Sequence, residues 1–231
     1  MFRSSRSRHR IISAAASRTL TLSAAVLAAV ACTKSEPADS PSSPTAEGGA
    51  ASSDAVTVAA SWRPVDDPDA VAAQRTRADA ARGAMFASLL GELMAAIDAG
   101  GHASAIDVCA ERAPAIAREV ADTQGVRIGR TSHRLRNPDN RVPAWAADAV
   151  DRRAAEPVEL LDETSGTFAT LTPIRLAPPC LACHGPADAL ADGVADALAG
   201  RYPDDTATGF AEGDLRGWFW VEVPVEPDAP T

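Results

Sequence analysis

The pentapeptide Cys-Leu-Ala-Cys-His at residues 180–184 constrains this chain more than any other feature, because its spacing is that of a covalent cofactor site. Cys-x-x-Cys-His is the attachment motif of c-type haem, in which two thiols bond to the porphyrin and the histidine binds the iron. The motif therefore predicts one covalently attached haem c. Cys180 and Cys183 are the predicted attachment residues, and His184 is a predicted iron ligand.

Two other chemistries use cysteines at this spacing. A redox-active Cys-x-x-Cys pair would close into a disulfide in an oxidising compartment, but such pairs usually open a helix, whereas the flanks here, "RLAPP" and "GPAD", are loop-like. A structural zinc site would need two more ligands nearby, which the remaining histidines, His9, His102 and His133, do not supply. Haem attachment is the preferred interpretation.

The first 31 residues have the pattern of an export signal. They contain five arginines and no acidic residue, followed by a small-residue apolar run from Leu20 to Ala31 that is too short for a typical spanning helix. The stretch "LAAVAC" resembles a bacterial lipobox and predicts lipidation of Cys32, with a plainly secreted protein as the alternative. We expect an exported, periplasmic lipoprotein anchored to the outer or inner membrane through Cys32.

Composition predicts the domain organisation behind this signal. Residues 32–66 are rich in Ser, Pro, Ala, Gly and acids and have few large apolar side chains, so they are expected to form a disordered tether. Residues 67–226 are long enough for one folded domain. Without the five leader arginines the chain has 17 basic and 31 acidic residues, a net charge of −14, which argues against nucleic acid as a partner.

Two helices are predicted in the first part of the domain. One runs from Pro68 to about Ala99, and its second half carries an apolar stripe from Met85 to Ile97 that serves the core or a homodimer. Glycines in "DAGGH" at 98–102 end it. The second helix runs from about Ala103 to Asp122 and ends at Gly125. Its inward stripe contains Ile106, Cys109, Ala113, Ile116 and Val120, so Cys109 is predicted to face inward.

The later part of the domain favours strands. Residues 126–132, 158–161 and 167–174 alternate like strands, and "LRGWFWVEVPV" closes the chain as an apolar one, in which Trp218, Phe219 and Trp220 are interpreted as core. Shorter helices are expected in "AWAADAVDRRAA" and at about Ala187 to Ala199. Helices first and hairpin-linked strands later predict an α+β fold, with the N-terminal helices packed on a small antiparallel sheet.

Three separate segments resemble one protein family. They are "GRTSHRLRNPDNRVPAWAADA" at 129–149, "CLACHG" at 180–185 and "RYPDDTATGFAEGDLRGWFWVEV" at 201–223. They are similar to bacterial haem-binding domains long catalogued as a domain of unknown function, and the resemblance covers roughly residues 70–224. It implies a PAS-like fold with one c-type haem, found alone or as the extracytoplasmic sensor of histidine kinases.

The resemblance also implies a second iron ligand. In that family a cysteine of an N-terminal helix can bind the iron, and the pattern reads here as "AIDVCAERAPAIA", which places this role on Cys109 opposite His184. An anionic sulfur ligand would lower the reduction potential. The alternative is that Cys109 is a small buried hydrophobic residue. His133, His102, Met85 and Met94 are the competing ligands, although the methionines also fit a core stripe.

Five arginines fall within fifteen residues of an otherwise acidic chain: Arg127, Arg130, Arg134, Arg136 and Arg141. A guanidinium matches a carboxylate, so one or two of them are expected to bind a haem propionate or a soluble anion, or else they form a solvated face. The acidic residues Asp204, Asp205, Glu212 and Asp214 have no identifiable nucleophile beside them, so no catalysis is assigned there.

The sequence thus predicts an exported monohaem c-type cytochrome rather than an enzyme. One-electron transfer to an unidentified redox partner protein ranks above redox sensing, because no output segment follows Val225. The alternatives are a haem-based gas or redox sensor that signals through a partner, a peroxidase-like enzyme with an open sixth iron position, and a haem-free thiol-disulfide or scaffold lipoprotein.

Overall fold

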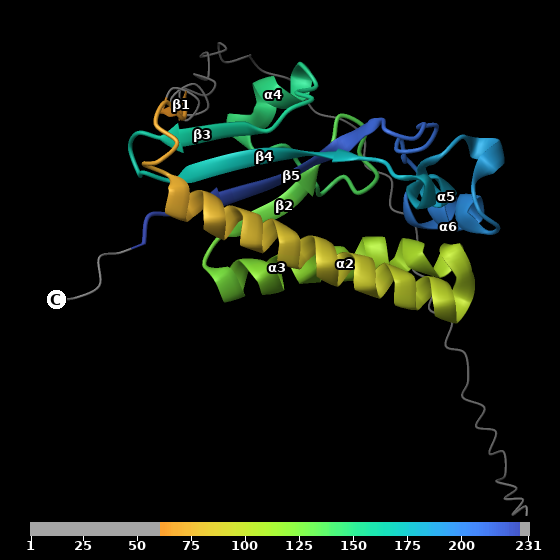
Figure 1. Cartoon of the computed structure of the whole chain (residues 1–231). Coiled ribbons are helices and arrows are strands. Elements are labelled where there is room, and N and C mark those ends of the chain that lie inside the picture. The colour runs from red at the N-terminus through yellow and green to blue at the C-terminus, as the bar shows by residue number, and fades with distance from the viewer. Residues whose placement is uncertain (1–60, 227–231) are drawn as a thin grey trace, which may run out of the picture. The chain divides into compact units, whose positions relative to one another are not determined.

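The computed structural model describes residues 61–226, so the predicted signal peptide, most of the tether and Cys32 lie outside the described residues. Five strands form one antiparallel sheet in the order β1-β3-β4-β5-β2 (Figure 1). The strands are β1 (Trp62–Pro64), β2 (Arg127–Thr131), β3 (Val158–Asp162), β4 (Phe168–Arg175) and β5 (Leu215–Val223). The predicted α+β fold is confirmed, and the arrangement is consistent with a PAS-like fold.

The folded part begins before the boundary expected at residue 67. Residues 62–64 were expected in the tether, but they form β1, which pairs antiparallel with β3 at one edge of the sheet. The composition-based boundary missed it because the strand is short and follows a polar segment. Trp62 packs on Trp145 with ring centroids 5.7 Å apart, and this aromatic contact helps to hold the edge strand in place.

Two long helical segments cover one face of the sheet, as the sequence predicts. They are α2 (Ala72–Asp107) and α3 (Ala113–Gln124), joined by a π-helical turn η1 (Val108–Arg112). Gly101 is non-helical (φ 78°) and kinks α2 within the predicted break at 98–102. Gly125 ends α3 in the left-handed conformation (φ 62°), where glycine lacks the steric cost of a Cβ.

Side chains on the two faces of β5 belong to two different apolar clusters of the core. Phe219, Val221 and Val223 pack against α2 and α3 in the larger apolar cluster, whereas Trp218 packs on the opposite face in a cluster with α4 (Ala147–Asp151). Trp218 is fully buried, and Phe219 is 8% exposed. The interpretation as core is therefore confirmed for Trp218 and Phe219, whereas Trp220 is only partly buried against the second cluster.

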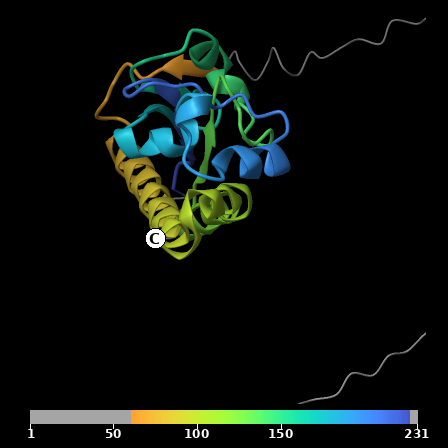
Figure 2. The ribbon, with the colours of Figure 1, turned by 90° about the vertical axis from the view of Figure 1, so that its right-hand side faces the viewer.

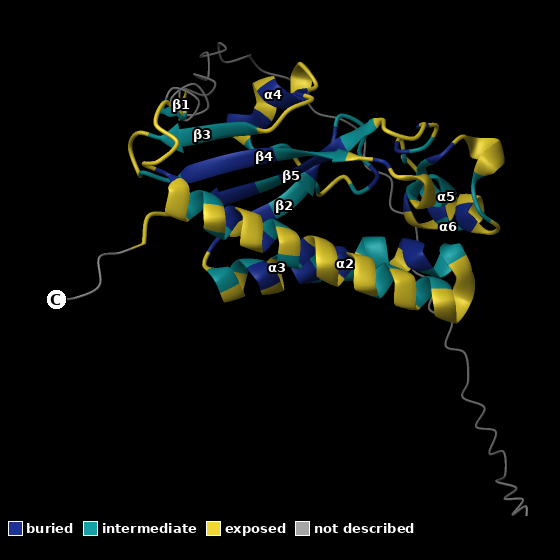
Figure 3. Cartoon of the chain, in the orientation of Figure 1, coloured by how far each residue is buried: buried dark blue, intermediate teal, exposed yellow. Residues whose placement is uncertain are grey.

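The apolar stripe of α2 divides between core and surface. Met85 and Leu89 are buried in the cluster under the helix, but Phe86, Leu90 and Met94 are exposed, although Phe86 still meets the ring of Phe219. Exposed residues occur along the whole of α2 (Figure 3). The apolar stripe of α2 is therefore wider than the part of the helix surface that the sheet covers. A homodimer stays a prediction, which sedimentation of the purified protein would test.

Short helices follow β4 and form the end of the molecule opposite β1. They are η3 (Pro178–Cys180), α5 (Leu181–His184), η4 (Ala187–Ala189) and α6 (Val194–Arg201). The single helix expected at 187–199 is divided, because Leu190 is extended and Gly193 adopts a left-handed φ of 74°. The helix expected at 144–155 is likewise shorter: η2 (Ala144–Ala146) leads into α4, and Arg153 has a positive φ of 54°.

Gly217 lets β5 enter the sheet beside the end of β2. A Cβ at this position would lie 2.3 Å from the carbonyl oxygen of Thr131, which is a backbone atom and cannot move aside cheaply. The β4–β5 register also shifts here, between Ile174 and Arg175. The irregular entry directs residues 207–216 toward α5, and so it helps to build the site.

Candidate functional site

The Cys-x-x-Cys-His segment lies on the short helices η3 and α5, at the end of the sheet that faces the viewer in Figure 2. Cys180 and Cys183 are partly buried free thiols. Cys180 packs with Leu176 and Phe210, whereas Cys183 packs in the cluster of Ile106 and Tyr202. The two thiols therefore border different apolar clusters, on either side of the same short helix.

Residues 207–210 run alongside this segment and fix its position through backbone hydrogen bonds. Gly209 N donates to Gly185 O at 2.7 Å, and Phe210 N donates to His184 O at 3.0 Å. The loop is anchored in turn by Asp205, whose carboxylate accepts from the Ala207 N–H at 2.8 Å. A segment that follows the motif by more than twenty residues thus determines how His184 is presented.

The imidazole of His184 is oriented by one short contact. Nδ1 lies 2.7 Å from the carbonyl oxygen of Ala207, and because a carbonyl only accepts, Nδ1 carries the proton and Nε2 keeps its free lone pair. Burial is the main reason why the pKa of His184 falls to about 3, and nearby Arg136 and Arg216 act in the same direction. The histidine is therefore neutral, which is the state required of a metal ligand.

Cys109 reaches the same site from the other half of the chain. It lies in η1, the π-helical turn, where the Ala113 N–H bonds to Val108 O instead of the carbonyl four residues earlier. Pro114 is the physical cause we assign, because it has no N–H to continue the α-helical pattern. Single π turns inside helices often occur at functional sites, since they re-aim one side chain.

The surroundings of Cys109 place it beside the motif. Its neighbour Ala110 packs in the same cluster as Cys183, and Cys109 contributes to the raised pKa of the Cys183 thiol, for which burial is the main cause. Ile106, Ala113, Ile116 and Val120 are buried as the stripe predicts, whereas Cys109 itself is only partly buried. The structure therefore places Cys109 in the same part of the domain as Cys183.

The competing ligand residues lie elsewhere or pack against other groups, and His133 Nδ1 is buried without a hydrogen-bond partner. Met85 is a buried core residue, and Met94 is half exposed on α2. His133 contacts the ring edges of Trp218 and Phe210 and is separated from His184 by Phe210, which contacts both imidazoles. His102 forms no hydrogen bond or ring contact among the described residues that would link it to the motif.

The five clustered arginines have different environments. Arg127 pairs with Glu222, Arg134 donates to the carbonyls of Thr206 and Thr208 and lies over Phe210, and Arg141 is exposed. Arg136 is buried and pairs with Asp205 at 3.1 Å, with 5% and 7% of the two side-chain surfaces exposed. Arg130 has no hydrogen bond or ion pair within residues 61–226. They do not form one solvated face.

The residues present fit the predicted haem. Three free thiols and one neutral imidazole with an available Nε2 are the donor set that a covalent haem with sulfur and nitrogen ligands requires. Two buried polar atoms beside them, Arg136 Nη1 and Tyr202 Oη, have no hydrogen-bond partner, which is costly unless a further group supplies one. Burial raises the pKa of Tyr202 to about 12, so this hydroxyl stays protonated.

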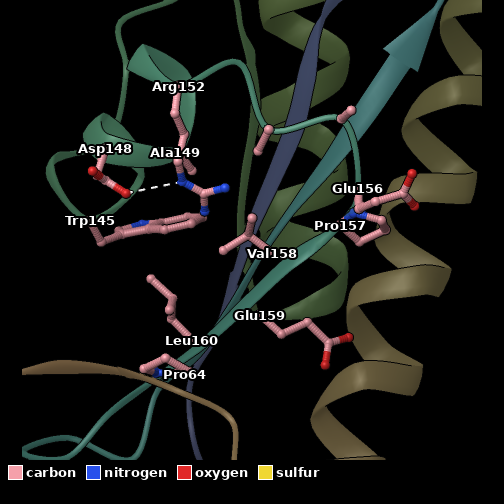
Figure 4. A pocket seen from close by; sticks show the side chains of 12 residues that line it. Pro64, Trp145, Asp148, Ala149, Arg152, Glu156, Pro157, Val158, Glu159 and Leu160 are labelled. Atoms are coloured by element: carbon pink, nitrogen blue, oxygen red, sulfur yellow. Dashed lines mark hydrogen bonds and ion pairs between the residues drawn. The ribbon is translucent and has the colours of Figure 1, made fainter.

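Other chemistry finds less support in the described residues. Between residues 61 and 226 no group of three or more His, Cys, Asp and Glu side chains could hold a metal ion, so a zinc site is not supported there. One surface hollow lies between α4 and β3 and is lined by Trp145, Arg152 and Leu160 (Figure 4). It contains none of the predicted site residues and no paired nucleophile and base.

Comparison with known proteins places the chain in a family. A family model described as Tll0287-like matches residues 17–224. The chain belongs to the Tll0287-like family. This confirms the family that the three sequence motifs predicted. Among solved structures, this Tll0287-like chain is similar to the crystal structure of the cyanobacterial haem protein Tll0287, with a TM-score of 0.47 and 20% sequence identity. The match covers 71% of this chain and 99% of the other. No curated protein matches it.

Several residues of the Tll0287-like site were not predicted individually. Tyr202, Ala207, Phe210 and Arg216 all border the motif, yet only the resemblance over residues 201–223 marked this segment at all. A backbone carbonyl such as that of Ala207 has no side-chain signature. Arg216 lies near the start of a strand-like run, and its sequence pattern does not distinguish it from an exposed arginine.

Proposed function

We propose that this protein is an exported c-type cytochrome with one covalent haem, held by thioether bonds to Cys180 and Cys183 and by axial ligands His184 and Cys109. The observation that carries the proposal is the position of Cys109 in the same part of the domain as Cys183. A partly buried thiol on a π turn there, together with a histidine whose Nε2 keeps its lone pair, supports iron ligation by both residues better than a packing role.

When bound, the haem supplies one-electron chemistry at its iron. The chain's own residues orient and shield it. Ala207 holds the imidazole of His184 through Nδ1, and η1 carries Cys109, which would supply the second ligand to the iron. The apolar clusters around Ile106 and Leu176 keep water from both thioether positions. A thiolate stabilises ferric iron over ferrous, so we expect a low reduction potential.

We favour electron transfer or redox sensing over an enzyme or a gas sensor, because two protein ligands leave no open iron position. Export, which the first 31 residues predict, agrees with this function, since c-type haem is attached outside the cytoplasm. Lipidation at Cys32 and residence at the periplasmic face of a membrane are part of the proposal, as is a redox partner protein. Mass spectrometry of the mature N-terminus would test the anchor.

The decisive experiment is the absorption spectrum of the mature protein made with the cytochrome c maturation machinery, before and after denaturation in alkaline pyridine. A pigment that stays on the chain with a two-thioether spectrum supports the proposal, and the native ferric bands report sulfur ligation. A colourless protein, or haem that extracts freely, would contradict it. Cys180→Ala/Cys183→Ala serves as the matched negative control.

A further inference from the structure

Three arginines converge on the site from different segments. Arg136 follows β2 in the chain, and Arg216 lies at the start of β5. Arg130 on β2 pairs with Phe219 of β5, and directly opposed residues of antiparallel strands share a face. Phe219 packs under α2 and α3, so Arg130 points to the same side as η1 and Cys109. Arg136 donates to the Cys183 carbonyl beside His184, and Arg216 lies over Phe210, whose ring contacts the His184 imidazole.

These arginines have too few protein partners. Arg136 Nη2 donates to Cys183 O at 2.7 Å and Ala207 O at 3.2 Å, and Asp205 is its counter-ion, but Nη1 is buried without a partner. Arg216 Nη1 donates to Ser132 Oγ and Arg134 O, both uncharged. Arg130 has neither a hydrogen bond nor an ion pair in the described part of the chain.

The charges around the site therefore do not balance. Three guanidinium groups face one carboxylate, that of Asp205, which leaves two positive charges without a counter-ion among the described residues. Burial lowers the pKa of Arg130, and it lowers that of Arg216 to about 10, which agrees with charges removed from water. Arg136 is buried, whereas Arg130 and Arg216 are partly buried, and charges in such positions are unfavourable when they are unpaired.

We propose that Arg130, Arg136 and Arg216 bind the two propionate carboxylates of the haem and neutralise them inside the domain. The inference rests on the proposed function and extends it to the charged edge of the cofactor. Two carboxylates supply the two missing negative charges, and the flat guanidinium fork matches their geometry. The unpartnered Arg136 Nη1 and the free donors of Arg130 and Arg216 then gain acceptors.

The alternative source of the same chemistry is a soluble carboxylate. A hollow at the outer edge of β2 is lined by Arg118, Arg130 and Arg141, and it would suit a small anion. Arg118 and Arg141 are exposed to water, where unpaired arginines are unremarkable in energetic terms. Arg136 and Arg216 do not line this hollow, and so an anion there would leave their charges unbalanced.

The test uses the haem-loaded protein with Arg130→Gln and Arg216→Gln, and Arg152→Gln as the matched control, because Arg152 is an exposed arginine on α4 paired only with Asp148. The thioether bonds do not depend on these arginines, so the variants stay loaded. Each site variant is expected to lower the reduction potential, since a nearby cation favours the reduced state. The double variant is expected to shift the reduction equilibrium at least tenfold, about 59 mV for one electron.

Resonance Raman spectroscopy gives the second readout. The propionate bending bands should move in Arg130→Gln and Arg216→Gln and not in Arg152→Gln, while Arg130→Lys should retain most of the potential because it retains the charge. Unchanged bands and potential in a protein with an intact two-thioether haem spectrum would overturn the inference and leave the proposed function standing. Loss of the covalent haem from the wild type would overturn the proposed function instead.

Titration of the wild-type protein with acetate at constant ionic strength separates the two sources. Propionates already occupying the arginines predict no dependence of the potential on acetate. A potential that changes with acetate, and stops changing in Arg130→Gln, would assign the arginines to a soluble carboxylate and refute the propionate assignment.

Discussion

The Nδ1 atom of His184 lies 2.7 Å from the carbonyl oxygen of Ala207, and this contact determines which imidazole nitrogen is available to a metal. The same carbonyl also accepts from Arg136 at 3.2 Å. Because a cation competes for that oxygen, the hydrogen bond donated by His184 is weakened and the imidazole is a poorer electron donor than it would be with Ala207 alone. The segment after the motif therefore tunes the ligand as well as placing it.

Replacing Cys109 should change the iron and leave the haem attached. Cys109→Ala removes the proposed thiolate, so the ferric spectrum should lose its sulfur-ligand bands and the reduction potential should rise by more than a tenfold change in the equilibrium, about 59 mV. Spectroelectrochemistry measures both. Arg152→Gln, an exposed substitution paired with Asp148, is the control and should match the wild type. An unaltered spectrum in Cys109→Ala would reassign Cys109 to packing.

The buried pair of Arg136 and Asp205 should matter for stability. Asp205→Asn removes the carboxylate that pairs with Arg136 at 3.1 Å and leaves one more positive charge unbalanced, and breaking a buried pair in this way typically costs about 3–5 kcal/mol. Denaturant unfolding of the haem-loaded protein measures it. The neighbouring Asp204→Asn, on an exposed carboxylate, should cost much less. Equal effects of the two substitutions would argue against a special role for the pair.

Gly217 should tolerate no side chain. In Gly217→Ala the new Cβ meets the Thr131 carbonyl oxygen at 2.3 Å, so β2 and β5 must separate, at a cost of about 1–3 kcal/mol by analogy with overpacked cores. Thermal unfolding checks this. Gly200→Ala is the control, because its Cβ would enter open space on α6 and should be neutral or mildly stabilising.

Acid should destabilise the protein partly through His133. Burial lowers the pKa of His133, with Arg153, Arg134 and Arg216 acting in the same direction, so the folded state favours the neutral ring. A depressed histidine pKa means that the unfolded chain binds the proton first, so its contribution is present above the ordinary pKa of about 6.5 and is lost as pH falls. Unfolding of His133→Gln should show a shallower loss between pH 7 and 5 than the wild type.

Arg201 should hold η1 against α6. Its guanidinium donates to Asp107 at 2.7 Å and to Glu111 at 2.6 Å, the residues two before and two after Cys109. Arg201→Met should have a small effect on stability, because the pair is exposed, but it should let imidazole displace the sixth iron ligand at lower concentration. Arg152→Met, which breaks an exposed pair on α4, should leave the imidazole titration unchanged.

Much of the fold followed from local pattern. The glycine stops near residue 101 and at Gly125, the strands around β2 to β5 and the inward stripe of α3 all come from interactions between near neighbours in the chain. The missed strand β1 and the division of the helix expected at 187–199 depend on tertiary pairing and on a left-handed Gly193, which apolar periodicity does not record.

The residues of the candidate site also differ in how far the sequence alone could predict them. Cys180, Cys183 and His184 are contiguous and could be identified by spacing, and Cys109 needed both the helical stripe and the family resemblance. The π turn that carries Cys109, the Ala207 carbonyl and the pairing of Arg136 with Asp205 all depend on contacts between distant segments. Arginines that look alike in the sequence thus have different environments in the folded chain. Arg136 belongs to a buried ion pair, Arg130 has no ion-pair partner among the described residues, and Arg141 is exposed.

The π turn at η1 belongs to the N-terminal half of the domain, whereas the attachment motif belongs to the C-terminal half. A haem could therefore be fastened to Cys180 and Cys183 on a chain that is still unfolded, but Cys109 can approach the iron only after α2, α3 and the sheet have docked. Ligation by Cys109 would then occur only in molecules whose tertiary structure is complete. The colour of the oxidised protein would distinguish correctly assembled molecules from those that carry the pigment on a misfolded chain.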